Sequence, residues 1–174
     1  MSPLLRWLPI SLALLTIALD QVGKWLALQY LRGEPIHSYL GDTVRLQYAR
    51  NTGAFLGMGA ALPDVARIAI FTVGTGAILV ICVVIALRRH WPRAAVIGLP
   101  LVFAGGISNL IDRVLRGSVV DYFNMGIGAF RTGIFNVADM AILLGVGFLL
   151  FSHESTREES DAGSPSPAQD PFTS

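Results

Sequence analysis

The sequence has little cysteine, histidine or charge, and each shortage excludes a class of protein. One cysteine among 174 residues excludes a disulfide scaffold and any cysteine-rich zinc or iron–sulfur site. The three histidines are scattered and do not indicate a zinc site. Charged residues make up 14% of the chain, against about 25% in a soluble domain. The net charge of +1 gives no basis for nucleic-acid binding.

Long apolar runs take the place of charge. Hydrophobic residues make up 53% of the chain, and residues 68–87 and 94–111 form runs of 20 and 18 residues without a charge. A helix needs about 20 such residues to cross a bilayer. Two further runs are apolar except for a few polar residues. The sequence therefore predicts a mainly α-helical membrane protein with transmembrane helices over residues 7–28, 68–87, 94–113 and 133–152.

The distribution of arginine indicates the orientation. Arg88, Arg89 and Arg93 crowd the short link between the second and third predicted helices, which is typical of a cytoplasmic loop. Four crossings then place both termini in the cytoplasm. The four predicted helices define a membrane domain over residues 1–152. Residues 153–174 are rich in Glu, Ser and Pro, which predicts a disordered cytoplasmic tail.

The segments predicted to lie outside, residues 31–66 and 114–132, contain short strand patterns. Residues 43–49 alternate between apolar and polar side chains, and residues 119–123 and 129–135 are also strand-like. Open sheet edges do not face lipid. We therefore expect a small sheet on the outer surface of the membrane.

Polar side chains gather at the outer ends of the predicted helices. Asp20 and Lys24 are four residues apart, so they share a helix face and are expected to form a structural ion pair. A charge inside a membrane helix costs about 2.5–3.5 kcal/mol on insertion scales, so it usually has a partner or a task. The other polar residues of this group are Asn51, Asn109, Asp112, Arg113, Asp121, Asn136 and Asp139.

Asp121 and Asp139 are the strongest candidates for chemistry, because each acid lies in an apolar segment with no basic residue within four positions. Two carboxyl groups that come close do not both ionise easily, so one retains a proton. Such a pair is suited to activating water and protonating a leaving group. The alternative is that each acid caps a helix or accepts backbone N–H groups. The asparagines have two similar alternatives, holding loops together or orienting a substrate.

Five sequence blocks resemble those of the bacterial lipoprotein signal peptidase (signal peptidase II) family. They occur in the family's order across residues 20–139, and together they are far more specific than any one alone. The blocks are Asp20-Gln21-x-x-Lys24, Asn51-Thr52-Gly53-Ala54-Phe55, Gly105-Gly106-x-x-Asn109-x-x-Asp112-Arg113, Val119-Val120-Asp121-Tyr122-Phe123 and Phe135-Asn136-Val137-Ala138-Asp139.

The resemblance implies an aspartic endopeptidase of the bacterial inner membrane that needs no cofactor or metal. Such an enzyme removes the signal peptide of a diacylglyceryl prolipoprotein by cutting just before the lipidated Cys, and globomycin inhibits it. The resemblance also implies a periplasmic sheet and a mobile periplasmic segment over the site, which we place near residues 55–63. We expect a monomer in contact with membrane lipid. Asp121 and Asp139 would be catalytic, and the residues that bind substrate or support the site would be Asp20, Lys24, Asn51, Gly53, Asn109, Asp112, Arg113 and Asn136.

Two other classes remain open at this point. A small proton-coupled transporter would use Asp20, Lys24 and Asp139 as a relay, but it requires acids spread across the depth of the membrane. A structural subunit of a membrane assembly would tolerate neutralisation of Asp121.

Overall fold

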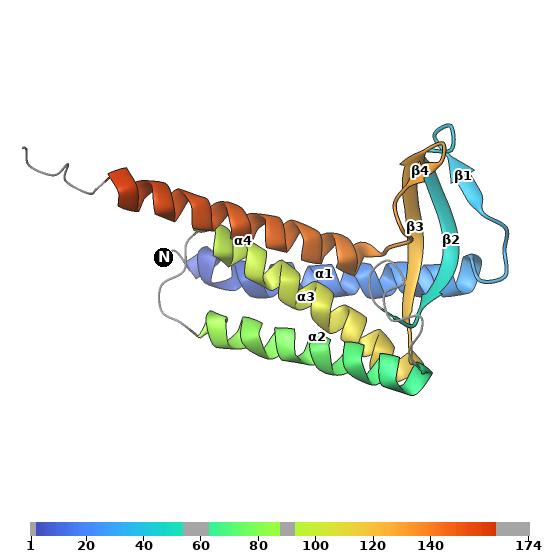
Figure 1. Ribbon diagram of the computed structural model, residues 1–174, viewed down its shortest axis with the longest axis horizontal. Helices are drawn as coiled ribbons and strands as arrows, with labels where there is room; N and C mark the ends of the chain where they lie inside the picture. The colour runs from blue at the N-terminus through green and yellow to red at the C-terminus, as the bar shows by residue number, and fades with distance from the viewer. Residues whose placement is uncertain (1–2, 54–62, 88–92, 163–174) are drawn as a thin grey trace, which may run out of the picture.

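A bundle of helices with a small sheet at one end makes up the described part of the chain. A computed structural model describes residues 3–53, 63–87 and 93–162. Figure 1 shows the helices lying roughly parallel, with the strands running across one end of the bundle. The helices are α1 (Pro3–Tyr30), α2 (Asp64–Ala86), α3 (Arg93–Arg116) and α4 (Val137–Ala162).

The helices match the apolar runs of the sequence. Within the described residues, the segments Trp7–Tyr30 and Ala95–Arg116 are long and apolar enough to cross a membrane, whereas Ala69–Val84 and Val137–Leu150 are shorter apolar segments. Large apolar side chains on α1, α2 and α4 point outward and are exposed. A water-soluble bundle would bury such side chains, so this surface fits a hydrocarbon surrounding. The mainly helical prediction is confirmed, and the number of crossings stays a prediction.

Two predicted boundaries at the last helix are wrong. The fourth apolar run was expected to be helical from residue 133, but α4 begins at Val137, because Phe135 forms a bridge to Phe123 of the sheet. The tail was expected to be disordered from residue 153, but α4 continues to Ala162. Three of the ten residues 153–162 are Glu, which favours helix. Residues 163–174 lie outside the described part.

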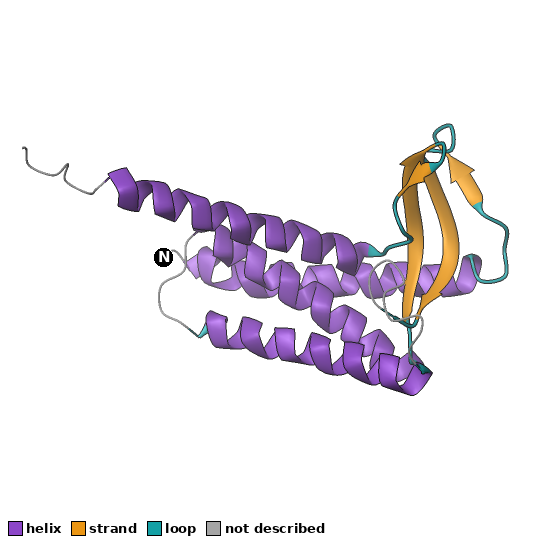
Figure 2. Cartoon of the chain, viewed as in Figure 1, coloured by secondary structure: helices purple, strands orange, loops and turns teal. Residues whose placement is uncertain are grey.

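The sheet has four antiparallel strands in the order β1-β2-β3-β4 (Figure 2). The pattern over residues 43–49 becomes β2, and the segment 119–123 becomes the first half of β3. The segment 129–135 contributes only a two-residue strand, and β1 was not predicted. The strands are β1 (His37–Tyr39), β2 (Val44–Asn51), β3 (Val119–Ile127) and β4 (Phe130–Arg131).

A β-bulge interrupts the pairing of β2 with β3. Leu46 lies opposite Phe123 and Ala49 lies opposite Asp121, so two residues of β2 face the single residue Tyr122. A bulge increases the local twist and redirects side chains, and such bulges are frequent beside active sites. This bulge lies immediately next to Asp121.

Helix α3 occupies the centre of the bundle and contacts α1, α2 and α4. Its contact with α4 is close because glycines lie on both sides. A Cβ atom on Gly145 would come within 2.6 Å of the Gly98 carbonyl oxygen, and one on Gly105 within 2.4 Å of the Ala138 carbonyl oxygen. Small residues allow such close backbone approach between membrane helices. This packing fixes the start of α4 against the middle of α3.

The glycine contact leads to a stability prediction with an internal control. Gly145→Ala should lower the thermal unfolding temperature in detergent, since overpacking a tight contact typically costs about 1–3 kcal/mol. Gly147→Ala is the control, because a Cβ atom at Gly147 meets no atom within 4 Å. That variant should unfold at the same temperature as the parent or higher. Equal losses in the two variants would contradict the close packing.

Candidate active site

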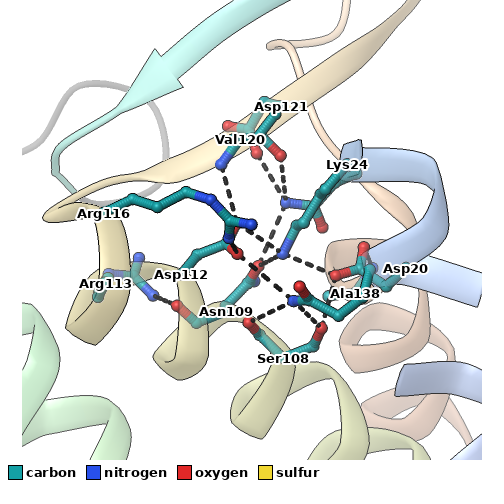
Figure 3. Close-up of polar contacts among 12 residues, drawn as sticks. Asp20, Lys24, Ser108, Asn109, Asp112, Arg113, Arg116, Val120, Asp121 and Ala138 are labelled. Carbon is teal, nitrogen blue, oxygen red and sulfur yellow. Dashed lines mark hydrogen bonds and ion pairs between the residues drawn. The ribbon is translucent and has the colours of Figure 1, made fainter. Parts of the chain in front are cut away.

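The polar residues singled out from the sequence meet where the helix bundle joins the sheet. They come from α1, α3, the end of β2, the start of β3 and the first turn of α4. Figure 3 shows the side chains from α1 and α3 pointing toward one another beneath β3. The predicted convergence at one end of the bundle is therefore present in the fold.

The ammonium group of Lys24 lies at the base of this cluster and is fully buried. Its Nζ atom lies 2.6 Å from Asp20 Oδ2 and 3.2 Å from Asp112 Oδ2, and it donates to Asn109 Oδ1 at 2.8 Å. These three partners match the three donors of an ammonium group. Asp20 also accepts the backbone N–H of Ala138 at 2.8 Å. Lys24 and Asp20 thereby join α1 to both α3 and α4.

Asp112 connects this buried charge cluster to the sheet. Its Oδ2 atom accepts the backbone N–H of Val120 at 3.1 Å, and its Oδ1 atom pairs with Arg116. The carbonyl of Val120 accepts Asn136 Nδ2 at 3.3 Å. The peptide groups of Val120 are therefore held from two directions, which fixes the backbone next to Asp121. Both carboxylate oxygens of Asp112 are therefore occupied by partners within the protein.

The start of α4 is a reciprocal cap formed by Asn136 and Asp139. Asn136 Oδ1 accepts the backbone N–H of Asp139 at 2.9 Å, and Asp139 Oδ2 accepts the backbone N–H of Asn136 at 3.2 Å. This is the capping-box arrangement, with an aspartate in the third helical position. Asp139 Oδ1 accepts Asn109 Nδ2 at 2.9 Å. Asp139 as a whole residue is half-buried.

The carboxyl group of Asp121 is almost fully buried and is held by two amides. Asn136 Nδ2 donates to Oδ1 at 2.7 Å, and Asn51 Nδ2 donates to Oδ2 at 3.0 Å. Asn51 is oriented in turn by the backbone N–H of Gly53, which donates to its Oδ1 atom at 3.1 Å. The Asn51–Gly53 turn therefore fixes one side of Asp121.

Burial and a neighbouring charge change the acidity of Asp121. Burial disfavours the ionised form, and the negative charge of Asp139 disfavours it further, so that the pKa of Asp121 rises to about 7. The amides of Asn51 and Asn136 and the charge of Lys24 oppose this rise. A carboxyl group with this pKa retains its proton at mildly acidic pH, when most aspartates are ionised.

Asn136 brings the two candidate acids together. Its side chain donates to Asp121, while its backbone N–H donates to Asp139. Arg113 Nη1 donates to the backbone carbonyl oxygen of Asn109 at 3.4 Å. Among the described residues, its buried Nε atom has no hydrogen-bond partner.

The structure brings all ten predicted site residues into one connected cluster. Sequence reasoning missed Ser108, whose hydroxyl group donates to Asp20 Oδ2 at 2.7 Å, and the support that Gln21 gives by donating to Ser108. No local pattern in α3 singles out Ser108, because its role depends on contacts with Asp20 and Gln21 of α1. The segment expected to close over the site, residues 55–63, lies almost wholly outside the described residues. In the part of the chain that is described, no group of three or more His, Cys, Asp or Glu residues is arranged to hold a metal ion.

Comparison with known proteins assigns the family. A family model described as signal peptidase (SPase) II matches residues 12–154. This chain belongs to the signal peptidase II family. It is 40% identical over 145 residues to a lipoprotein signal peptidase of Geobacillus thermodenitrificans, covering 82% of this chain and 86% of the relative. It is 38% identical over 151 residues to one of Sphingopyxis alaskensis, covering 86% of each chain.

Solved structures agree with this signal peptidase II fold. A bacterial membrane enzyme determined at 2.3 Å superposes with a TM-score of 0.76 at 24% identity, over 92% of this chain and 94% of that one. Another, determined at 1.9 Å, gives a TM-score of 0.73 at 26% identity, over 83% and 90%. The protein is an integral membrane peptidase.

The buried charge cluster leads to a second stability prediction. Lys24→Met keeps most of the side-chain volume but leaves Asp20 and Asp112 without their shared cation. Removing one partner of a buried ion pair costs about 3–5 kcal/mol. Thermal unfolding in detergent should therefore shift strongly downward. Arg45→Met is the control, because Arg45 pairs with Asp42 on the accessible surface of the sheet. A Lys24 variant as stable as the Arg45 variant would contradict this role.

Proposed function

We propose that this protein removes the signal peptide of prolipoproteins whose Cys carries diacylglycerol, and that it cuts just before that Cys. Asp121 and Asp139 form its catalytic pair. The strongest support is the junction at Asn136, which holds one buried acid on the sheet and a second acid on α4 at the same place. The family assignment supports the class of substrate.

Asp139 acts as the general base in this proposal. Its two oxygens accept N–H groups from Asn109 and Asn136, and neither partner requires a proton on the carboxylate. Asp139 also lies in the first turn of α4, where the helix dipole favours a negative charge. The carboxylate takes a proton from a water molecule, which then attacks the carbonyl carbon of the scissile peptide bond.

Asp121 acts as the general acid. In this proposal Asp121 holds the proton and Asp139 is ionised; burial and the charge of Asp139 raise the pKa of Asp121 to about 7, which favours its protonated form. It donates a hydrogen bond to the carbonyl oxygen of the substrate and then helps to protonate the leaving amine. No covalent intermediate between enzyme and substrate forms during these steps.

The other site residues position these two acids and the substrate. Asn109, Asn136 and Asn51 orient the carboxyl groups, and Gly53 orients Asn51. Within the described part of the chain the buried Nε–H of Arg113 has no hydrogen-bond partner, and we assign it to a backbone carbonyl of the substrate. The remaining residues, Asp20, Lys24 and Asp112, hold the helices against the sheet.

The proposed membrane arrangement follows from the arginines and the exposed apolar surfaces. All four helices cross the inner membrane, both termini lie in the cytoplasm, and the sheet end of the bundle lies at the periplasmic face. Substrate acyl chains move from lipid to protein without the gain of leaving water, so selectivity depends on shape and on polar groups near the cut. The enzyme acts as a monomer without a cofactor or metal, and globomycin inhibits it.

The transporter alternative is not favoured. A proton relay needs acids at several depths, whereas Asp20, Asp121 and Asp139 belong to one cluster at the sheet end of the bundle.

Neutralising either acid tests the catalytic assignment. Asp121→Asn and Asp139→Asn should each lower the cleavage rate of a diacylglyceryl prolipoprotein by at least about 10²-fold, since general acid–base catalysis contributes about 10²–10⁴-fold. The purified variants are assayed by gel shift of the product, with and without globomycin. Asp42→Asn, at the far end of the sheet, is the matched control and should cleave normally. Normal turnover by either site variant would disprove the pair.

The raised pKa of Asp121 predicts the pH dependence. The pKa of Asp121 is raised to about 7, so its carboxyl group is protonated below that pH and loses its proton as the pH rises through it. The value of kcat/KM should therefore fall on the alkaline side of about pH 7. It should also fall in acid, where Asp139 becomes protonated and no base remains. The measurement is steady-state kinetics from pH 4 to 10. A kcat/KM that does not decline on the alkaline side would contradict the assignment of Asp121 as the acid.

A further inference from the structure

The turn end of the sheet presents an apolar face that the catalytic scheme does not use. Residues that lie directly opposite each other in antiparallel strands point to the same face. The pairs Tyr39–Val44, Val44–Met125 and Ile127–Phe130 therefore form one continuous apolar row across all four strands.

The opposite face of the same strands is polar and internally satisfied. Ser38, Arg45 and Asn124 are cross-strand partners on this face. Arg45 donates twice to Asp42, and Arg131 donates to Asn124 Oδ1 at 2.5 Å. The turn end is therefore amphipathic, with one face suited to water and the other not.

The apolar row is exposed where it reaches the turns. Phe130 is 89% exposed and Ile127 is 78% exposed, and Leu40 in the adjoining turn is 79% exposed. Tyr39 and Met125 are also exposed. A monomeric soluble domain rarely leaves such side chains together in water, and their clustering marks an interaction surface.

The position of this surface identifies its partner. Figure 1 shows β4 on the helix side of the sheet, with the β3–β4 turn projecting beyond the bundle on the side of α4. The flank of α4 carries exposed apolar side chains, including Leu143 and Leu144. A flank of this kind is suited to lipid, so in the proposed topology the projecting turn lies over the bilayer surface.

We infer that this surface, formed by Tyr39, Leu40, Met125, Ile127 and Phe130, inserts into the lipid interface of the outer leaflet. Interfacial amphipathic helices bury their apolar face about 5–10 Å into the boundary between headgroups and acyl chains, and the apolar face of this sheet end would meet the same boundary. Because β3 carries both Asp121 and the inserted residues, lipid contact at the turns fixes the depth of the catalytic pair. The inference rests on the proposed topology but not on the assignment of the acids.

Site-directed fluorescence tests this contact without substrate. In a Cys82→Ala background, Phe130→Cys is labelled with an environment-sensitive dye and reconstituted in phosphatidylethanolamine–phosphatidylglycerol vesicles. Lipids carry a quencher either near the headgroup or in the middle of the acyl chain. The dye at residue 130 should be quenched severalfold more by the shallow lipid than by the deep one. Ser38→Cys, on the polar face, is the matched control and should be quenched weakly by both.

A third labelled position separates failure of this inference from failure of the topology. Leu143→Cys on α4 should be quenched strongly by the deep lipid. Quenching at residue 143 but not at residue 130 would overturn lipid insertion alone. Absence of quenching at both positions would overturn the topology, and the inference with it.

An activity comparison distinguishes lipid from a polypeptide partner. Phe130→Asp should slow cleavage severalfold in vesicles and leave it unchanged in detergent, whereas Ser38→Asn should leave both rates unchanged. An equal loss in detergent would assign the surface to substrate binding and overturn the inference. A dimer in mild detergent that Phe130→Asp dissociates would assign it to a second copy of the chain, with the same consequence.

Discussion

The buried ammonium group of Lys24 is the interaction on which the rest of the site depends. A fully buried charge is tolerated only when its partners satisfy it completely, and here those partners lie on different helices. Asp20, which pairs with Lys24, also accepts the backbone N–H of Ala138 in α4. Asp112, the second partner of Lys24, accepts the backbone N–H of Val120 in β3. The two elements that carry the candidate acids are therefore fixed by the same cation. The contacts that neutralise the buried charge of Lys24 are therefore the same contacts that position the two candidate acids.

Asn136 extends this arrangement from folding to chemistry. It begins α4, contacts the carbonyl of Val120, and donates to Asp121. Its neighbour in the cap, Asp139, supplies the second acid. The glycines between α3 and α4 add the close backbone contact that keeps this junction compact. Proposed catalysis, helix capping and interhelical packing thus share a small number of atoms.

Much of this was predictable, because polar side chains in apolar segments have few alternatives to meeting one another. The i,i+4 spacing of Asp20 and Lys24 predicted their pairing directly. The alternation over residues 43–49 predicted β2, and the strand-like segment 119–123 predicted the first half of β3. The start of α4 was misplaced because Phe135 is as apolar as the helix that follows, and only its pairing with β3 excludes it. The role of Ser108 depends on contacts between distant helices, which local patterns do not encode.

The reciprocal cap at the start of α4 has a consequence for turnover. Because Asp139 is held by the first turn of its own helix, its rotamer is selected when the chain folds and not when the substrate arrives. In the proposed mechanism, the entropic cost of orienting the reactive oxygen is then met once in the lifetime of the molecule, and each catalytic cycle starts from an already aligned carboxylate. Lengthening that side chain to glutamate would separate these two tasks, since the longer arm would have to give up either the cap or the reactive position.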